Sequence, residues 1–146
     1  MTLNEVIQIL AAFVGTLGFA ILFNIRGMRL VAAAAGGLLS WFLFIVINKF
    51  IINEPVTYLI VACIISVYAE IMARVLKTPT TSFITASLIP LIPGGSLYYT
   101  MVHAFSGNYE AFLPKAIYTL QLASALALGI IVSTTLARAI NKLKSK

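Results

Sequence analysis

A long apolar segment that is interrupted near its middle is the feature that most constrains how this chain can fold. Residues 81–102 are apolar enough to cross a bilayer, yet two prolines and two glycines fall between Pro90 and Gly95. Proline lacks a backbone N–H and clashes with the carbonyl group four residues back, so helix bonds to Ala86 and Ile89 are threatened. In lipid such a break persists only where protein or a watery cavity covers the bare backbone groups. Transporters use broken helices of this kind to build substrate sites near the membrane midplane.

The composition is that of an integral membrane protein. Hydrophobic residues make up 61% of the 146 residues and charged residues only 10%, against about 25% charged residues in a soluble domain. We expect an all-α fold with one transmembrane domain over residues 1–146, in which the fourth of five transmembrane helices is broken. Each apolar segment is about 20 residues long, as a bilayer core of ~30 Å requires. Their expected bounds are about 6–23, 30–47, 56–76, 81–102 and 116–137.

The basic residues predict how the chain is oriented. Eight of the ten Lys and Arg residues lie between the first and second helices, between the third and fourth, or after the fifth. The other two, Lys49 and Lys115, lie on the opposite side. The excess of positive charge marks the cytoplasmic side, so the N-terminus is expected outside and the C-terminus in the cytoplasm. A unit of five helices has its two ends on opposite sides of the membrane, and two such units can pair in opposite orientations, as in many transporters. Here the second unit would come from another chain or from a second copy.

Several classes of function are disfavoured by the residues themselves. The net charge of +6 is spread over helix ends, and it forms no basic helix face or motif for nucleic acid. His103 stands alone without a second His, Cys or Asp at metal-ligand spacing, so we expect no metal site. No nucleophile-elbow or zinc-protease motif is present. We therefore expect neither an enzyme nor a bound cofactor.

The break itself is the candidate site. A half-helix that begins near Gly95 would point its positive dipole end at an anionic carboxylate, and the freed carbonyls of Ala86 and Ile89 would be open to a cation. The two glycines would allow a solute or a neighbouring backbone to approach closely. The alternative is a kink that serves only helix packing. The candidate substrate-binding and hinge residues are Thr85, Ser87, Pro90, Pro93, Gly94, Gly95, Ser96 and Tyr98.

Three further features leave two interpretations each. Glu70 lies inside the third apolar segment, and it is either a proton-coupling group or the partner of Arg74 one helix turn later. Tyr98, with its neighbour Tyr99, either lines the solute path or belongs to the interfacial aromatic belt. The small residues around Gly36 favour close helix packing and a possible subunit contact.

Three elements of the sequence resemble the threonine/serine exporter family. The run IPLIPGGSLYYTM at residues 89–101 resembles its "PLvPG" signature, and AEIMARVLKTPTTSF at residues 69–83 resembles the approach to it. FAILFNIRGMRL at residues 19–30 is similar to a third element, although Ile25 and Arg26 replace its usual proline turn. More closely, the chain looks like the separate small subunit of the two-component form.

The resemblance implies a secondary-active exporter in the bacterial plasma membrane that works with a larger homologous membrane subunit. Its expected solute is a small amino acid such as threonine or serine, or a dicarboxylate, moved by alternating access around the broken helix. Besides the larger subunit, the expected partners are the lipid bilayer and a carboxylate-bearing solute, with a homo-oligomer of the chain as an option. The alternative function is that of a scaffold subunit that stabilises a partner transporter without transporting.

Overall fold

The computed structural model describes residues 2–144, and the elements in this range are all helical. Lys146, counted above among the basic residues, lies outside the described residues. The α-helices are α1 (Leu3–Leu22), α2 (Met28–Asn48), α3 (Glu54–Val75), α4 (Thr80–Ser87), α5 (Gly94–Phe105) and α6 (Tyr109–Lys144), with a 3₁₀ turn, η1 (Ile89–Leu91), between α4 and α5.

Local sequence signals explain where the first helices begin and end. Thr2 and Glu5 form a capping box at the start of α1: the Thr2 hydroxyl accepts from the Glu5 N–H at 3.4 Å, and the Glu5 carboxylate accepts from the Thr2 N–H at 2.9 Å. This box starts the helix three residues before the expected position. After α1 the chain turns through Asn24 and Gly27, which have φ angles of 58° and 65°. Asparagine and glycine tolerate this left-handed region better than other residues.

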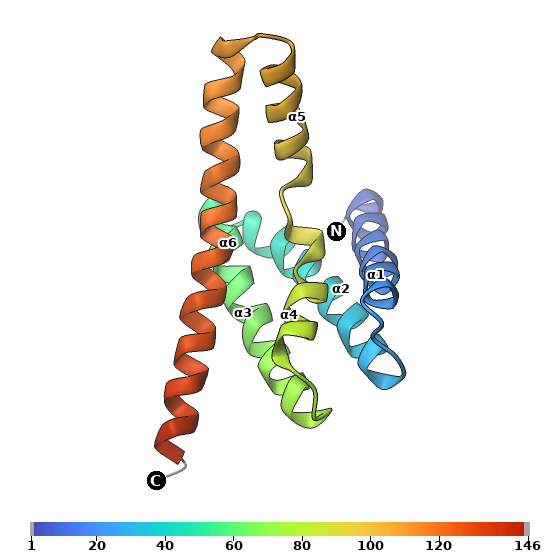
Figure 1. The fold of residues 1–146 in the computed structure, drawn as a ribbon. Helices are drawn as coiled ribbons and strands as arrows, with labels where there is room; N and C mark the ends of the chain where they lie inside the picture. Colours follow the sequence, from blue (N-terminus) through green and yellow to red (C-terminus); the bar gives the residue numbers. More distant parts are fainter. Residues whose placement is uncertain (1, 145–146) are drawn as a thin grey trace.

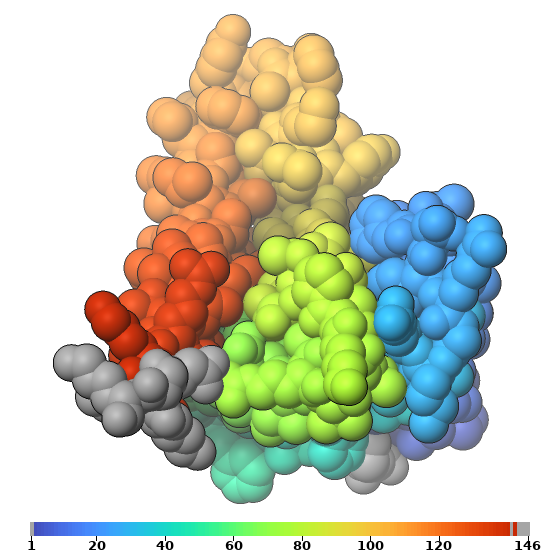
Figure 2. All heavy atoms as spheres, turned by 60° about the horizontal axis from the view of Figure 1, so that its bottom comes forward, coloured from blue at the N-terminus to red at the C-terminus, as the bar shows by residue number. Residues whose placement is uncertain are grey.

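Helices α1, α2 and α3 alternate in direction, α4 and α5 both run opposite to α3, and α6 runs in the same direction as α3, against which it packs (Figure 1). As a result the α1–α2 connection, the α3–α4 connection and the end of α6 all lie at one end of the molecule, which we call the basic end. It carries Arg26, Arg29, Arg74, Lys77 and Arg138. At this end α4 lies between α6 and the α1–α2 hairpin (Figure 2). The charge pattern of the sequence therefore corresponds to one physical end of the fold.

Glycines allow the helices to pack at close range, as the small-residue patch predicted. A Cβ atom built on Gly36 would lie 2.9 Å from Cε1 of Tyr68 and would also collide with Ser87 of α4. One built on Gly37 would lie 2.5 Å from Cβ of Thr16 in α1. In α6, a Cβ on Gly129 would lie 2.7 Å from the Leu59 carbonyl oxygen of α3. The Gly36 and Gly37 contacts are within the chain, so they do not by themselves indicate a subunit interface.

The last helix differs from its expected bounds. It begins at Tyr109 instead of about residue 116 and has 36 residues, which is about 54 Å at 1.5 Å per residue. The Asn108 side chain caps its start by accepting from the Ala111 N–H at 3.2 Å. Pro114 lies in the second turn, where it removes the helix bond to the carbonyl of Glu110, an exposed residue. Together with α5, the start of α6 forms an arm that projects from the other helices (Figure 2).

Four helices in the described residues are long and apolar enough to span a bilayer, namely α1, α2, α3 and α6. The expected fourth span at residues 81–102 is divided instead among α4, η1 and α5. Neither α4, with 8 residues, nor α5, with 12, is long enough to cross the hydrocarbon core by itself. The chain is thus an all-helical, multi-pass membrane protein.

Candidate functional site

The chain between α4 and α5 is held by short-range backbone bonds. The Leu91 N–H donates to the Leu88 carbonyl at 2.9 Å, and the Ile92 N–H donates to the Ile89 carbonyl at 3.1 Å. The expectation of a free carbonyl at Ile89 is therefore wrong, because the 3₁₀ turn supplies it with a new donor. The other carbonyl expected to be free belongs to Ala86, whose residue is completely buried.

The backbone N–H groups at the start of α5, unlike the Ile89 carbonyl, have no hydrogen-bond partner within their helix. Pro93 is the N-cap of α5, and its carbonyl accepts from the Leu97 N–H at 2.9 Å. The N–H groups in the first turn of a helix have no acceptor within that helix. Those of Gly95 and Ser96 therefore point out of the start of α5, where the helix dipole favours an anion.

A cavity of about 330 Å³ lies against this helix start. Its walls come from α2, α3, the α4–α5 connection, α5 and α6, so it joins segments that are far apart in the sequence. The residues that line it are Trp41, Glu54, Tyr58, Pro90, Ile92, Pro93, Gly94, Gly95, Ser96, Lys115, Tyr118 and Leu122. We refer to it below as the break pocket.

The break pocket contains one carboxylate and one ammonium group. Glu54, the first residue of α3, accepts a hydrogen bond from the Tyr118 hydroxyl of α6. The Lys115 ammonium lies 5.2 Å from the centre of the Tyr118 ring. Lys49, also near this end of the helices, is 2.8 Å from the Glu5 carboxylate and so is already paired. The pocket therefore offers groups of both signs beside the apolar side chains of Trp41 and Leu122.

This arrangement suits a small zwitterion. The amides of Gly95 and Ser96 together with the Lys115 ammonium present positive charge to a carboxylate. The Glu54 carboxylate presents negative charge to an α-ammonium group. A small number of placed polar groups in one concave site is what a ligand pocket uses to fix the orientation of its ligand.

Five of the expected site residues line the break pocket, and three do not. Pro90, Pro93, Gly94, Gly95 and Ser96 are all on its wall. Thr85 is exposed and lies beside Ser82 in a separate shallow depression. Ser87 is fully buried against Gly36, and its hydroxyl has no hydrogen-bond partner among the described residues.

The aromatic residue Tyr98 does not line the pocket. It is 64% exposed, and its ring packs edge-on against that of Tyr99 at 5.4 Å. The close approach of a neighbouring backbone to the two glycines is not observed. A Cβ added to Gly94 or Gly95 would meet no atom of another described segment within 4 Å. No neighbouring backbone therefore requires glycine here, and the space in front of both residues is open.

The break pocket also lies closer to one end of the fold than to its middle. Trp41 is seven residues before the end of α2, or about 10 Å, and Glu54 begins α3. The site is therefore displaced from the middle of the bundle toward the end opposite the basic end.

Glu70 and Arg74 form a separate group at the basic end. The Arg74 Nη2 atom donates to Glu70 Oε1 at 3.0 Å, and the Thr80 hydroxyl donates to Oε2 at 3.0 Å. The pairing interpretation is confirmed. A proton-coupling role for Glu70 stays a prediction.

Sequence reasoning missed the pocket residues that come from α2, α3 and α6. Glu54 and Lys115 were predicted only to lie on the side of the membrane that is poor in Lys and Arg. A signal for them does exist, because a charged residue at a helix end that faces an apolar bundle requires a partner or a solute. Within the described residues, no group of three or more His, Cys, Asp or Glu side chains could hold a metal ion.

A multi-pass helical bundle with a polar pocket at a discontinuous segment is typical of secondary transport proteins. The sequence model of one such family, described as "Threonine/Serine exporter, ThrE", matches residues 8–136. The chain belongs to this threonine/serine exporter family, and its function is of the amino-acid export type. No curated protein and no solved structure matches the chain. The family is one of transporters, which agrees with the expectation that the chain is not an enzyme.

Proposed function

We propose that this chain is the small membrane subunit of a secondary-active exporter, and that it binds a small amino acid in the break pocket. The observation that carries the proposal is the convergence on one cavity of the α5 N-terminus, Lys115 and Glu54. Threonine and serine carry both charges that these groups complement. A dicarboxylate would use the amides and Lys115 but would be repelled by Glu54.

The segment α4–η1–α5 supplies the fifth crossing in this proposal. It runs from the basic end past the ends of α2 and α3, and α5 then packs along α6. With this crossing the two termini lie on opposite sides. The excess of Lys and Arg puts the basic end in the cytoplasm and the N-terminus outside, in a bacterial plasma membrane.

The break is also the hinge in this proposal. Only the turn at η1 and the residues from Ile92 to Pro93 connect α4, which packs inside the bundle, to α5, which packs on α6. A rotation at this connection would move the start of α5 relative to Glu54 and open the pocket toward one side at a time.

In transporters built from inverted repeats, a complete exporter needs a second helical unit of opposite orientation. The larger homologous subunit implied by the family resemblance is the proposed partner, and a second copy of the chain is the alternative. A proton or ion gradient drives export, with Glu70 as the candidate coupling group.

The test uses liposomes that contain the chain together with the larger subunit, loaded with labelled threonine or labelled succinate. Glu54→Gln is expected to reduce threonine efflux at least tenfold and to leave succinate efflux equal or higher. Lys115→Gln is expected to reduce the efflux of both. Unchanged threonine efflux in both variants would refute the proposed site.

The scaffold function makes a different prediction in the same assay. Under it, Gly94→Leu and Pro93→Ala change the amount of complex but not the efflux per complex. Because a Cβ atom added to Gly94 meets no atom of another described segment within 4 Å, Gly94→Leu should leave the amount of protein intact. Loss of efflux per complex in this variant would therefore exclude the scaffold function.

A further inference from the structure

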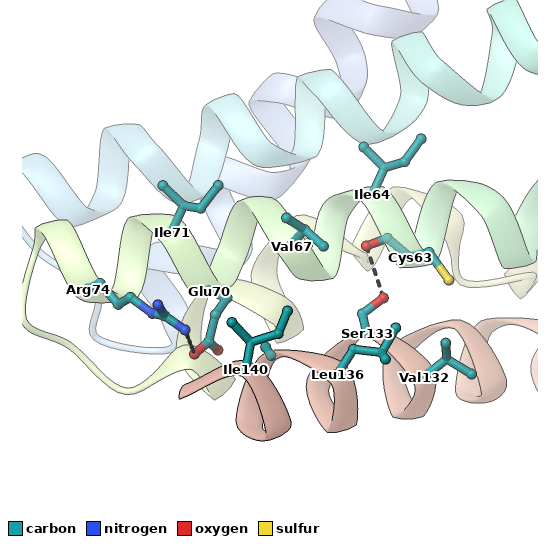
Figure 3. Close-up of a pocket in the computed structure, with 11 residues that line it drawn as sticks. Cys63, Ile64, Val67, Glu70, Ile71, Arg74, Val132, Ser133, Leu136 and Ile140 are labelled. Carbon is teal, nitrogen blue, oxygen red and sulfur yellow. Dashed lines mark hydrogen bonds and ion pairs between the residues drawn. The ribbon is translucent and has the colours of Figure 1, made fainter. Parts of the chain in front are cut away.

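A second cavity of the protein is a groove between α3 and α6, outside the break pocket. Its volume is about 490 Å³, and aliphatic side chains of both helices form nearly all of its wall (Figure 3). It begins beside the close contact at Gly129, next to the hydrogen bond from the Ser133 hydroxyl to the Cys63 carbonyl at 3.1 Å. It ends at the ion pair of Glu70 and Arg74.

The length of the groove matches one leaflet of a bilayer. On α3 it extends from Cys63 to Arg74, which is about 16 Å along the helix. Half of a hydrocarbon core of ~30 Å is about 15 Å. The groove thus runs from the middle of the bundle to the basic end, in the direction in which the acyl chain of a phospholipid would lie.

The charge at its end favours an anionic lipid. The Arg74 side chain is 53% exposed and bonds to Glu70 through Nη2 only, while a guanidinium group carries five N–H donors. Both oxygens of Glu70 already accept hydrogen bonds, from Arg74 and from Thr80. Basic pockets between transmembrane helices on the cytoplasmic side are suited to anionic head groups.

We propose that this groove binds an anionic phospholipid, with one acyl chain between α3 and α6 and the lipid phosphate on the Arg74 guanidinium. The wall formed by Val67, Leu136 and Ile140 contacts the chain, and Arg74 selects the head group. The lipid would then connect α3 and α6 at the basic end. At their opposite ends the same two helices both line the break pocket. This proposal does not depend on the solute or on transport.

The test is native mass spectrometry of the purified full chain in detergent, with added phosphatidylglycerol or with phosphatidylcholine of the same acyl chains. The wild-type chain should retain phosphatidylglycerol in preference. Arg74→Gln should reduce that preference about fivefold, the factor that one basic residue contributes at an anionic surface, whereas Arg74→Lys should keep most of it. Val67→Trp should fill the groove and weaken the retention of both lipids.

Two control variants separate the groove from general effects. Arg29→Gln removes a charge at the basic end away from the groove, and Val14→Trp places the same bulk on an exposed position of α1. Neither should change lipid retention. A melting curve in detergent shows whether Val67→Trp is folded.

Equal retention of the two lipids by the wild-type chain would overturn the proposal, as would an unchanged preference in Arg74→Gln. If a second copy of the chain fills the groove instead, the spectra will show a dimer that Val67→Trp removes. That result also overturns the assignment to lipid.

Discussion

The contact between Thr16 of α1 and Gly37 of α2 permits a sharp test of the packing. Thr16 is fully buried, and an added methyl group on Gly37 would lie 2.5 Å from Cβ and 2.7 Å from Cγ2 of this threonine. The three atoms nearest to this methyl group all belong to Thr16. Gly37→Ala therefore forces the two helix backbones apart, and Thr16→Gly removes the obstacle.

The magnitude follows from two opposing effects. Overpacking a well-packed interior costs about 1–3 kcal/mol, whereas alanine favours a helix over glycine by about 1 kcal/mol. In the wild-type background Gly37→Ala should lower the free energy of unfolding by up to about 2 kcal/mol, the difference between these effects. In the Thr16→Gly background only the helix preference remains, so the same change should be neutral or stabilising. The coupling between the two sites is then about 1–3 kcal/mol.

The assay is reversible unfolding in mixed micelles titrated with sodium dodecyl sulfate. Trp41, the only tryptophan of the chain, lies on α2 one turn after Gly37 and reports the transition by its fluorescence. Gly18→Ala on α1 is the matched control, because its added methyl group meets no atom within 4 Å. Additive effects of Gly37→Ala and Thr16→Gly would show that the helices do not touch here, and the packing argument would fail.

Three further predictions concern single positions. Ser133→Ala removes the hydrogen bond to the Cys63 carbonyl and should lower the free energy of unfolding by about 1 kcal/mol in the same titration. Gly94→Leu should change that free energy by less than about 0.5 kcal/mol, since the space around it is open, and a loss above this would show that the start of α5 is packed. Pro114→Ala restores a backbone N–H to the helix in the arm. It should raise the free energy of local opening around this position by up to about 3 kcal/mol, measured as slower amide hydrogen exchange.

Several local features could be predicted from neighbouring residues alone. The first three helices lie within a few residues of their expected bounds, because long apolar runs and their flanking polar residues mark both ends. The break falls where Pro90 and Pro93 stand, since proline excludes a regular helix whatever its surroundings. Glu70 pairs with Arg74 because a spacing of four residues places them on one helix face.

Other features depended on partners that the local sequence does not specify. The carbonyl of Ile89 was expected to be free, but the tighter 3₁₀ turn gave it the Ile92 N–H. The last helix was expected to start at about residue 116, and a cap at Asn108 starts it earlier despite Pro114. Ser87 was a candidate for the solute, yet helix packing buried it against Gly36.

The sequence by itself determined the class of the protein, the order of its helices, the excess of charge at one end and the position of the break. These follow from hydrophobicity and backbone chemistry, which act over a few residues. Only the tertiary structure decided what lies beside the break: Glu54 from α3 and Lys115 from α6 reach the start of α5 there. The physical reason is that α3 and α6 pack closely where Gly129 of α6 meets α3. This contact determines which residues, distant in the sequence, share a cavity.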